Sequence, residues 1–493
     1  MYQRLFLLIV LLALQLPAAT PADAAIALSV RRVNAAYFNT TVDWNTAGSF
    51  WFGKIDVGQI PGRNYADVRV AYTPTDLHVF VAIADYYLWY EDSPSQSSDP
   101  TQYTHDGLSL YIDALDNRSA APDTNDYVFQ AKLAQAHFDL PRWKRQARGT
   151  GSGWNSSFNG TWQYTPGLEW SCNPGPNSNS CGIDYGWAAT YRIPWSTIGL
   201  SGAPNGRTIG MGLQLFDRDA SGGGGIGAVQ YWPENLSPTQ PATWGQIGFA
   251  VSSYSPPLAR AAGTVTVQRG LPGSTVIDST VGDDGSCGAA HEGDPNSTLK
   301  PSNGQPHGLD TSLYIGAEAV MTHLPCYGRG YLRFNLNQVP PGKVIISAQL
   351  TLYHWSQSGE LNAANPEDRP STSYIKLYQV DGGWTETGVT WNNSPLAKQD
   401  LGGVWVPPRP SGGNLWPGIP YTWNATSAVA NAYYAGQPVD LALYTPDTGR
   451  NSLKYFTSSD AGDWNAVARP KLTITYGDLV SVASQTYLPS LGR

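Results

Sequence analysis

Apolar and polar residues alternate along most of this chain, in short runs separated by turn-forming residues. Alternation with a period of two is typical of half-buried β-strands. In the first half of the chain the alternating runs cover residues 68–72, 77–83, 108–112, 187–193 and 209–215. In the second half they cover residues 332–336, 346–352, 439–443 and 472–476. This pattern predicts an all-β protein made of antiparallel sandwiches with long loops.

Between the two series, residues 252–262 contain Pro, Ser and Ala without periodicity, which is typical of a linker. We therefore predict two jelly-roll-like β-sandwich domains, over residues 27–251 and 264–477, joined by this short linker. Residues 478–493 lack a core-forming pattern and are predicted to be a loosely ordered C-terminal tail.

The second domain is predicted to hold one helix. Thr426 is placed as its N-cap, residues 427–435 form its body, and Gly436 ends it. No other stretch has a helical period of useful length.

The segment 384–395 carries two tryptophans, Trp384 and Trp391, and ends at Pro395. Their spacing around Gly388 fits neither a regular strand nor a helix, so we expect an ordered loop. The rings either plug a sheet edge, where a Trp buries roughly 200 Å², or stand exposed as a platform for sugars.

The first residues predict the compartment. Arg4 precedes an apolar run that ends at Leu16, and proline and small residues follow, so residues 1–24 are predicted to be a secretory signal peptide. That run is too short for a membrane span, and no later run approaches roughly 20 apolar residues. We expect a secreted, extracellular protein, either free or associated with the cell surface.

The amino-acid composition supports the prediction of an all-β fold and excludes some classes of binding partner. Charged residues make up only 14% of the chain, while Gly, Pro, Tyr and Trp are abundant. The net charge of −8 argues against nucleic acid or anionic lipid as the principal partner. It leaves neutral glycans open.

Four cysteines in a secreted chain suggest two disulfides, with three connectivities open. The spacing favours Cys172–Cys181 and Cys287–Cys326. The alternative for the second pair is a zinc site with His291 and His323, which an oxidising compartment disfavours.

Four segments of the first half carry a family resemblance, at residues 66–85, 105–113, 186–195 and 231–245. They contain a hairpin with an acidic strand end, an Ile-Asp strand, and a Gly-Trp…Ile-Pro-Trp element. They resemble the family-9 carbohydrate-binding modules and their DOMON-like relatives. The resemblance implies a β-sandwich that binds sugars by aromatic stacking, often with a structural calcium.

Six segments of the second half carry a second family resemblance. They lie at residues 308–316, 329–336, 346–353, 384–395, 421–426 and 469–476. They resemble the DNRLRE-type domain, a jelly-roll sandwich of secreted bacterial proteins, some of which bind polysaccharides such as alginate. In that family the 384–395 segment recurs whatever the partner, which is typical of packing residues. The resemblance therefore favours the plug, with Trp384 and Trp391 largely buried. Residues 458–464 depart from the Ser-x-Glu of many relatives, so no particular binding residue is carried over.

Aromatic clusters beside polar loops are the candidate glycan site, because an aromatic ring covers the apolar C–H face of a pyranose. The predicted glycan-binding residues are Tyr86, Tyr87, Trp89, Tyr90, Asp106 and Trp154. The alternative for each ring is a core or loop anchor. Trp187, Trp195 and Trp244 stand within strand patterns and are assigned to packing.

Calcium takes six to eight oxygen ligands, so acidic loops are its candidate sites. The predicted ligands are Asp85, Asp92 and Asp106 in the first domain, with Asp278, Asp283 and Asp284 as a second group. None has EF-hand spacing, and acidic loops without an ion are the alternative.

No catalytic motif is present: there is no Gly-x-Ser-x-Gly, His-Glu-x-x-His or phosphate-binding loop. We predict a secreted, non-catalytic protein that binds polysaccharide or cell-wall glycan. The alternatives are a structural or adhesive cell-surface protein and a polysaccharide lyase or hydrolase, whose paired carboxylates sequence alone does not exclude.

Overall fold

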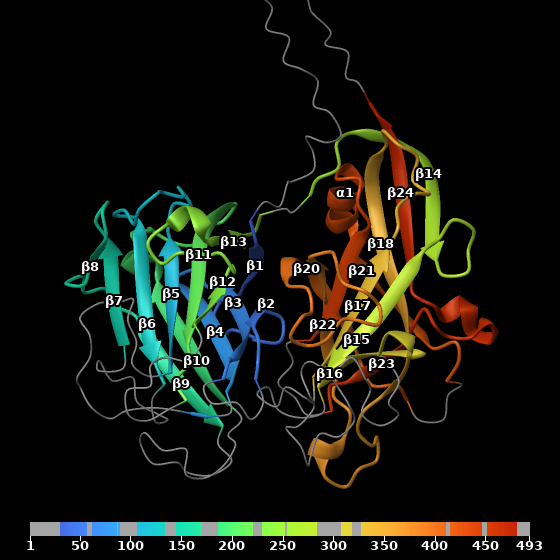
Figure 1. Ribbon diagram of the computed structural model, residues 1–493, viewed down its shortest axis with the longest axis horizontal. Helices are drawn as coiled ribbons and strands as arrows, with labels where there is room; N and C mark the ends of the chain where they lie inside the picture. The colour runs from blue at the N-terminus through green and yellow to red at the C-terminus, as the bar shows by residue number, and fades with distance from the viewer. Residues whose placement is uncertain are drawn as a thin grey trace, which may run out of the picture.

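The computed structural model describes residues 30–56, 62–85, 87–88, 106–133, 144–169, 186–219, 229–251, 254–282, 307–317, 327–410, 415–445 and 451–480. The predicted signal peptide, the four cysteines and the zinc alternative lie outside these residues. The chain is all-β, as predicted, and its two halves lie side by side (Figure 1). No helix in the described ranges is long and apolar enough to cross a membrane.

The N-terminal half is a sandwich of two mainly antiparallel sheets. The outer sheet holds β8 (Trp154–Asn155), β7 (Lys144–Gly149), β6 (Asp126–Lys132), β5 (Gly107–Asp113), β11 (Arg207–Phe216), β12 (Val229–Trp232) and β13 (Gly245–Phe249). The inner sheet holds β9 (Gln163–Glu169), β10 (Gly186–Pro194), β4 (Asp76–Ala84), β3 (Tyr65–Tyr72) and β2 (Gly48–Gly53). β1 (Arg32–Tyr37) runs parallel to β13 and then to β3, so it passes from one sheet to the other.

The C-terminal half is a second antiparallel sandwich. One sheet holds β15 (Val276–Gly282), β17 (Tyr327–Phe334), β22 (Val439–Tyr444), β19 (Ser373–Val380) and β20 (Ala397–Val406). The other holds β14 (Ala259–Gln268), β24 (Lys471–Leu479), β18 (Val344–Gln357), β21 (Ile419–Asn424) and β23 (Lys454–Thr457). β16 (Ser312–Ala317) pairs with β17 and β23 and so connects the two sheets.

Two boundaries differ from the prediction. β14 begins at Ala259, inside the predicted linker, because its backbone pairs with β24 as far as Leu479. The helix is confirmed as α1 (Thr426–Tyr434), but Ala425 occupies the N-cap position. The Thr426 hydroxyl instead lies 2.6 Å from Asn424 Oδ1, while Gly436 has the positive φ of +64° expected of a helix stop.

The two sandwiches share a buried interface. Period-two alternation predicts that one face of β3 meets solvent, yet all eight of its residues are buried. The reason is that its second face packs against the C-terminal half. Tyr444 donates its hydroxyl proton to the Asp67 carboxylate, and the buried Arg329 guanidinium donates to the Tyr65 hydroxyl.

Further contacts join the halves. Arg329 lies 3.7 Å from the Trp51 ring centroid and 4.5 Å from that of Tyr444, which makes a buried cation–π cluster. Arg32 of β1 pairs with Gln399 of β20, so a strand bridge crosses the junction. The two halves are therefore packed against each other and share one continuous hydrophobic core.

The two tryptophans of the 384–395 segment are buried, at 6% and 7% exposure, and the prediction that they plug the structure is confirmed. Trp384 Nε1 donates to Asp440 Oδ1 over 2.6 Å. The Trp391 ring lies 5.1 Å from the Tyr65 ring, so it closes the interface between the halves. The three tryptophans assigned to packing, Trp187, Trp195 and Trp244, are buried as well.

Candidate functional site

An aromatic ladder runs along the outer face of the C-terminal sandwich. It consists of Tyr314, Tyr455, Trp355, Trp416 and Trp464. Neighbouring ring centroids lie 5.1, 5.8, 5.1 and 4.9 Å apart in that order. The last ring, Trp464, is 69% exposed, and the other four are half-buried.

Strand alternation places three of these rings outside the core. Tyr314 stands between the buried Leu313 and Ile315 of β16. Trp355 follows the buried His354 of β18, and Tyr455 precedes the buried Phe456 of β23. These strands are paired in one sheet, so their outward side chains meet on one face.

Two buried arginines hold the loops that carry the tryptophans. Arg409 Nη1 donates to the carbonyl oxygens of His354 and Leu415, which fixes the chain next to Trp416. Arg469 Nη2 donates to the Ala461 carbonyl over 2.6 Å, and so fixes the turn before Trp464. These hydrogen bonds therefore hold the loops that carry Trp416 and Trp464 in place.

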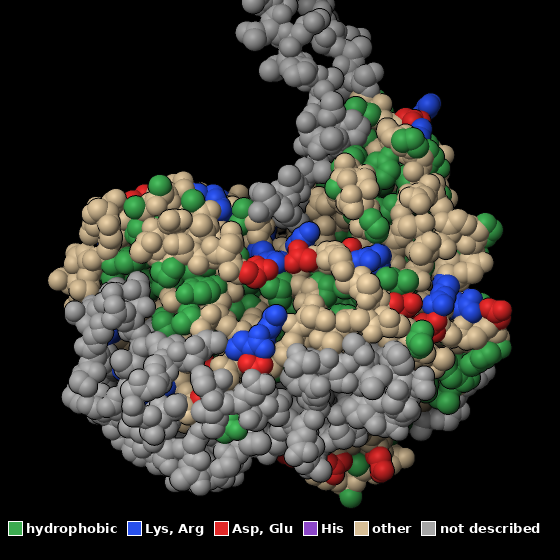
Figure 2. Space-filling view, in the orientation of Figure 1, with side chains coloured by type: hydrophobic (Ala, Val, Ile, Leu, Met, Phe, Trp, Pro, Cys, Tyr) green, Lys and Arg blue, Asp and Glu red, His purple; other side chains and the backbone are tan. Residues whose placement is uncertain are grey.

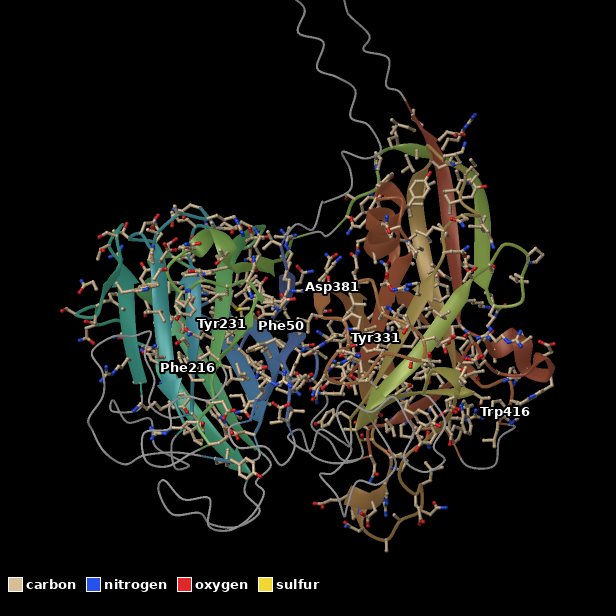
Figure 3. The ribbon with its side chains drawn as sticks, viewed as in Figure 1. Phe50, Phe216, Tyr231, Tyr331, Asp381 and Trp416 are labelled. Carbon is tan, nitrogen blue, oxygen red and sulfur yellow. The ribbon has the colours of Figure 1, made fainter. Side chains whose placement is uncertain are left out.

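The ladder lies at the end of the molecule away from the junction. Figure 3 labels Trp416 there, and Figure 2 shows hydrophobic side chains gathered at the same edge. Half-buried and exposed rings in contact with one another cover a sugar face at low entropic cost, because each ring is already held by its neighbours.

A second aromatic group lies on the outer sheet of the N-terminal half. The Trp154 and Trp244 rings are 6.5 Å apart and nearly parallel, at 3°. Tyr111 of β5 lies 5.3 Å from Trp244, and its hydroxyl donates to Gln214 Oε1 over 2.6 Å. Tyr231 of β12 is half-buried against the same group (Figure 3). Trp244 and Tyr111 are buried, so the rings of this group that reach the surface are Trp154 and Tyr231, which we call the N-terminal face.

The predicted glycan residues are only partly brought together. Trp154 lies on the N-terminal face, half-buried. Tyr87 packs half-buried against the core, and Asp106 is buried, where its Oδ1 accepts from the Arg218 backbone N–H over 2.7 Å. Tyr86, Trp89 and Tyr90 lie outside the described residues.

Three buried carboxylates converge where β4 and β11 end. Asp85, Asp217 and Asp219 each offer an oxygen within 4.8 Å of the others. Asp85 Oδ1 accepts from the Tyr87 backbone N–H, and Asp219 Oδ2 accepts from that of Gly62. Both oxygens of Asp217 are buried without a hydrogen-bond partner in the part of the chain that the structure describes.

Burial, followed by the charges of Asp85 and Asp219, raises the pKa of Asp217 well above its usual range. Such a carboxyl is either protonated near neutral pH or balanced by a cation. Three hard oxygen donors at this spacing suit a divalent ion such as calcium.

Among the predicted calcium ligands that the structure describes, Asp85 alone belongs to this group. Asp106 is not a member, and Asp92 lies outside the described residues. Asp217 and Asp219 were missed by sequence reasoning. Their signal was the Asp-Arg-Asp directly after the strand that ends at Phe216, which places two carboxylates at one sheet end.

The second acidic group also differs from its prediction. Asp278 lies within 4.8 Å of Glu386 and Asp460, while Asp283 and Asp284 are outside the described residues. Burial raises the pKa of Asp278 to about 8, although the Ser459 backbone N–H lowers it. Arg269 Nη1 lies 2.6 Å from Asp460 Oδ1, so a protein cation already balances part of this charge.

Residues 300–476 match the model of carbohydrate-binding module family 96. This segment holds all five residues of the ladder. A search of curated proteins gives no match.

Among solved structures, the chain is similar to a carbohydrate-binding module of family 9 from Caldicellulosiruptor kristjanssonii in complex with cellotriose. The identity is 16%, the TM-score is 0.31, and the match covers 45% of this chain and 95% of that one. The same module in complex with glucose gives 16% identity and a TM-score of 0.31, with 97% of that chain covered.

Proposed function

We propose that this chain is a secreted, non-catalytic polysaccharide-binding protein whose principal glycan surface is the aromatic ladder. The observation that carries the proposal is the contact chain from Trp355 through Trp416 to the exposed Trp464, within a segment that matches a carbohydrate-binding module. Carbohydrate recognition is the function to which a fixed row of half-buried rings ending in an exposed one is best suited, because such a row stacks on successive sugar faces without reordering.

Affinity gel electrophoresis against neutral and uronic acid polysaccharides tests the proposal. The double variant Trp416→Ala/Trp464→Ala should lose the retardation that the parent chain shows. Trp405→Ala is the matched control, since Trp405 is also exposed, at 46%, but is not part of the ladder. Unchanged retardation of the double variant would assign the binding to another surface.

The same samples test the absence of catalysis. We expect no reducing sugar and no unsaturated product to be released from any polysaccharide that retards the chain. Either product would replace the binding proposal with a hydrolase or a lyase.

We also propose that Asp85, Asp217 and Asp219 hold a calcium ion with a structural role. The support is the unpartnered, buried Asp217 carboxylate between two other carboxylates. An ion would replace the water that these oxygens lose on folding. Removing calcium with a chelator should lower the melting temperature, and calcium but not magnesium should restore it.

The variant Asp217→Asn tests whether calcium binds at this site rather than elsewhere in the protein. The variant should fold and should show no calcium-dependent change in melting temperature. Asp278→Asn is the control, because Asp278 belongs to the other acidic group. A calcium response that persists in Asp217→Asn would show that the ion binds elsewhere.

A further inference from the structure

The junction between the two halves contains an open cleft of about 550 Å³. Its N-terminal wall comes from the ends of β2 and β3 and from β12, and its C-terminal wall comes from residues 391–396. The volume is within the range of small-ligand sites. Figure 2 shows basic and acidic side chains gathered along this junction.

The floor of the cleft is a preformed contact between the halves. Asn392 Oδ1 accepts from the Ile55 backbone N–H over 2.9 Å, and Asn392 Nδ2 donates to the Ile55 carbonyl over 2.8 Å. Beneath it, the Tyr65 and Trp391 rings pack together over the Arg329 guanidinium. A ligand would therefore meet a surface that is already ordered, which lowers the cost of binding.

The walls offer stacking and hydrogen bonding together. Tyr231 contributes a half-buried ring, and Lys54 contributes an exposed ammonium that has no ion-pair partner among the described residues. From the other half comes the Ser394 hydroxyl, which donates to the Trp391 carbonyl over 2.9 Å and can still accept a hydrogen bond from a ligand. The neighbouring Asn393 amide is already bonded to Thr390 and Gly388, so it shapes the wall. One ring with several donors and acceptors around it is the chemistry that recognises a sugar, whose hydroxyl groups surround an apolar ring face.

The cleft also continues a surface already described. Tyr231 packs against the Trp154 and Trp244 group and lines the cleft as well. A glycan chain lying on the N-terminal face would reach the cleft through this one ring.

We propose that the cleft is a composite binding site for a short oligosaccharide segment, built from both halves and separate from the ladder. Tyr231 would stack on a sugar ring, and Lys54 and Ser394 would bind its hydroxyl groups from opposite walls. The proposal rests on the proposed function only in taking the ligand to be a glycan.

Isothermal titration of the full chain with cellohexaose and with hexagalacturonate tests the proposal. Lys54→Ala and Ser394→Trp change opposite walls, the first by removing a donor and the second by filling the cleft. Each should weaken binding of the same probe, by about fivefold for the loss of one hydrogen bond, and by more for the filled cleft. Ser201→Trp, at an exposed position outside the cleft, should bind as the parent does. Melting temperatures establish that the variants fold.

The outcomes separate the two proposals. If Trp416→Ala/Trp464→Ala abolishes binding of both probes while the two cleft variants bind normally, the cleft proposal fails and the ladder stands. If both cleft variants weaken binding and the ladder variant does not, the cleft stands and the ladder fails. If neither probe binds the parent chain, the cleft proposal is overturned, and the polysaccharide gels alone decide the proposed function.

Discussion

Lys376 and Asp400 form a buried ion pair, with Lys376 Nζ 2.5 Å from Asp400 Oδ2. Both residues belong to the C-terminal half, yet the N-terminal half completes the pair. Asp400 Oδ2 also accepts from the Ser49 backbone N–H over 3.0 Å, and Lys376 Nζ donates to the Ala47 carbonyl. Backbone groups of the N-terminal half thus replace the water that would otherwise hydrate the two charges. The ion pair is therefore stable only while the two halves are packed together.

Lys376→Ala should destabilise the whole protein, because it leaves the Asp400 carboxylate buried without its cation. We expect a loss of about 3–5 kcal/mol in the free energy of unfolding, measured by urea denaturation. Lys343→Ala is the control, since its partner Asp478 is half exposed and an exposed pair contributes little to stability. Equal losses in the two variants would contradict a desolvated pair.

Trp384→Ala should destabilise the fold by about 3–5 kcal/mol, since it leaves a cavity and removes the indole donor from Asp440. Trp384→Phe keeps most of the packing and loses only the hydrogen bond, so its loss should be smaller, about 1–3 kcal/mol. Chemical denaturation monitored by circular dichroism measures both. If the two variants lose equal amounts of unfolding free energy, the hydrogen bond to Asp440, rather than the packing of the ring, stabilises this segment.

Trp464→Ala alone should weaken polysaccharide binding about tenfold, a change of about 1.4 kcal/mol, without altering the melting temperature. The exposed ring adds contact with the glycan but little to the core. Titration with a soluble polysaccharide that retards the chain in gels measures the affinity, and calorimetry measures the melting temperature. A drop in melting temperature with unchanged affinity would make Trp464 a structural residue.

The Asp126 carboxyl should make stability depend on pH. Burial, together with the charges of Asp113 and Asp123, raises its pKa to about 7, although the Asp123 backbone N–H opposes the rise. Its unfolded pKa is about 3.9, so its contribution to stability is complete below that pH and is lost as the pH rises through 7.

Asp126→Asn keeps an acceptor for the Asp123 N–H and does not titrate. The variant should match the parent near pH 4 and become relatively more stable towards pH 7, as measured by urea denaturation across that range. Glu360→Gln, at an exposed position, should stay parallel to the parent. A constant difference between Asp126→Asn and the parent would refute the titration.

The strands, the helix and the burial of Trp384 and Trp391 were predictable because each depends on local alternation or on a short motif. The junction was not. Asp67 and Arg69 occupy alternate positions of β3 that resemble a solvent-facing strand, and the residue that meets Asp67 is Tyr444, far along the chain. Nothing local in the sequence distinguishes a polar face in water from a polar face against another domain.

The ladder was missed for a related reason. Its rings come from separate strands and loops, and each of the three strands contributes one aromatic residue beside a core position. Sequence reasoning favoured aromatic residues that are contiguous, such as those from Tyr86 to Tyr90. Spatial clusters assembled by strand pairing leave no contiguous signal.

Among the described residues, the hydrogen bonds between Asn392 and Ile55 and the strand bridge between Arg32 and Gln399 hold the two halves against each other. The ladder and the N-terminal face are therefore held at a fixed distance and orientation. Two modules joined by a flexible linker would not keep such a fixed spacing. If both surfaces bind glycan, a fibre whose chains repeat at the matching interval would engage both at once, whereas a differently spaced fibre would engage one. The fold would then select for the packing of a polymer as well as for its sugars.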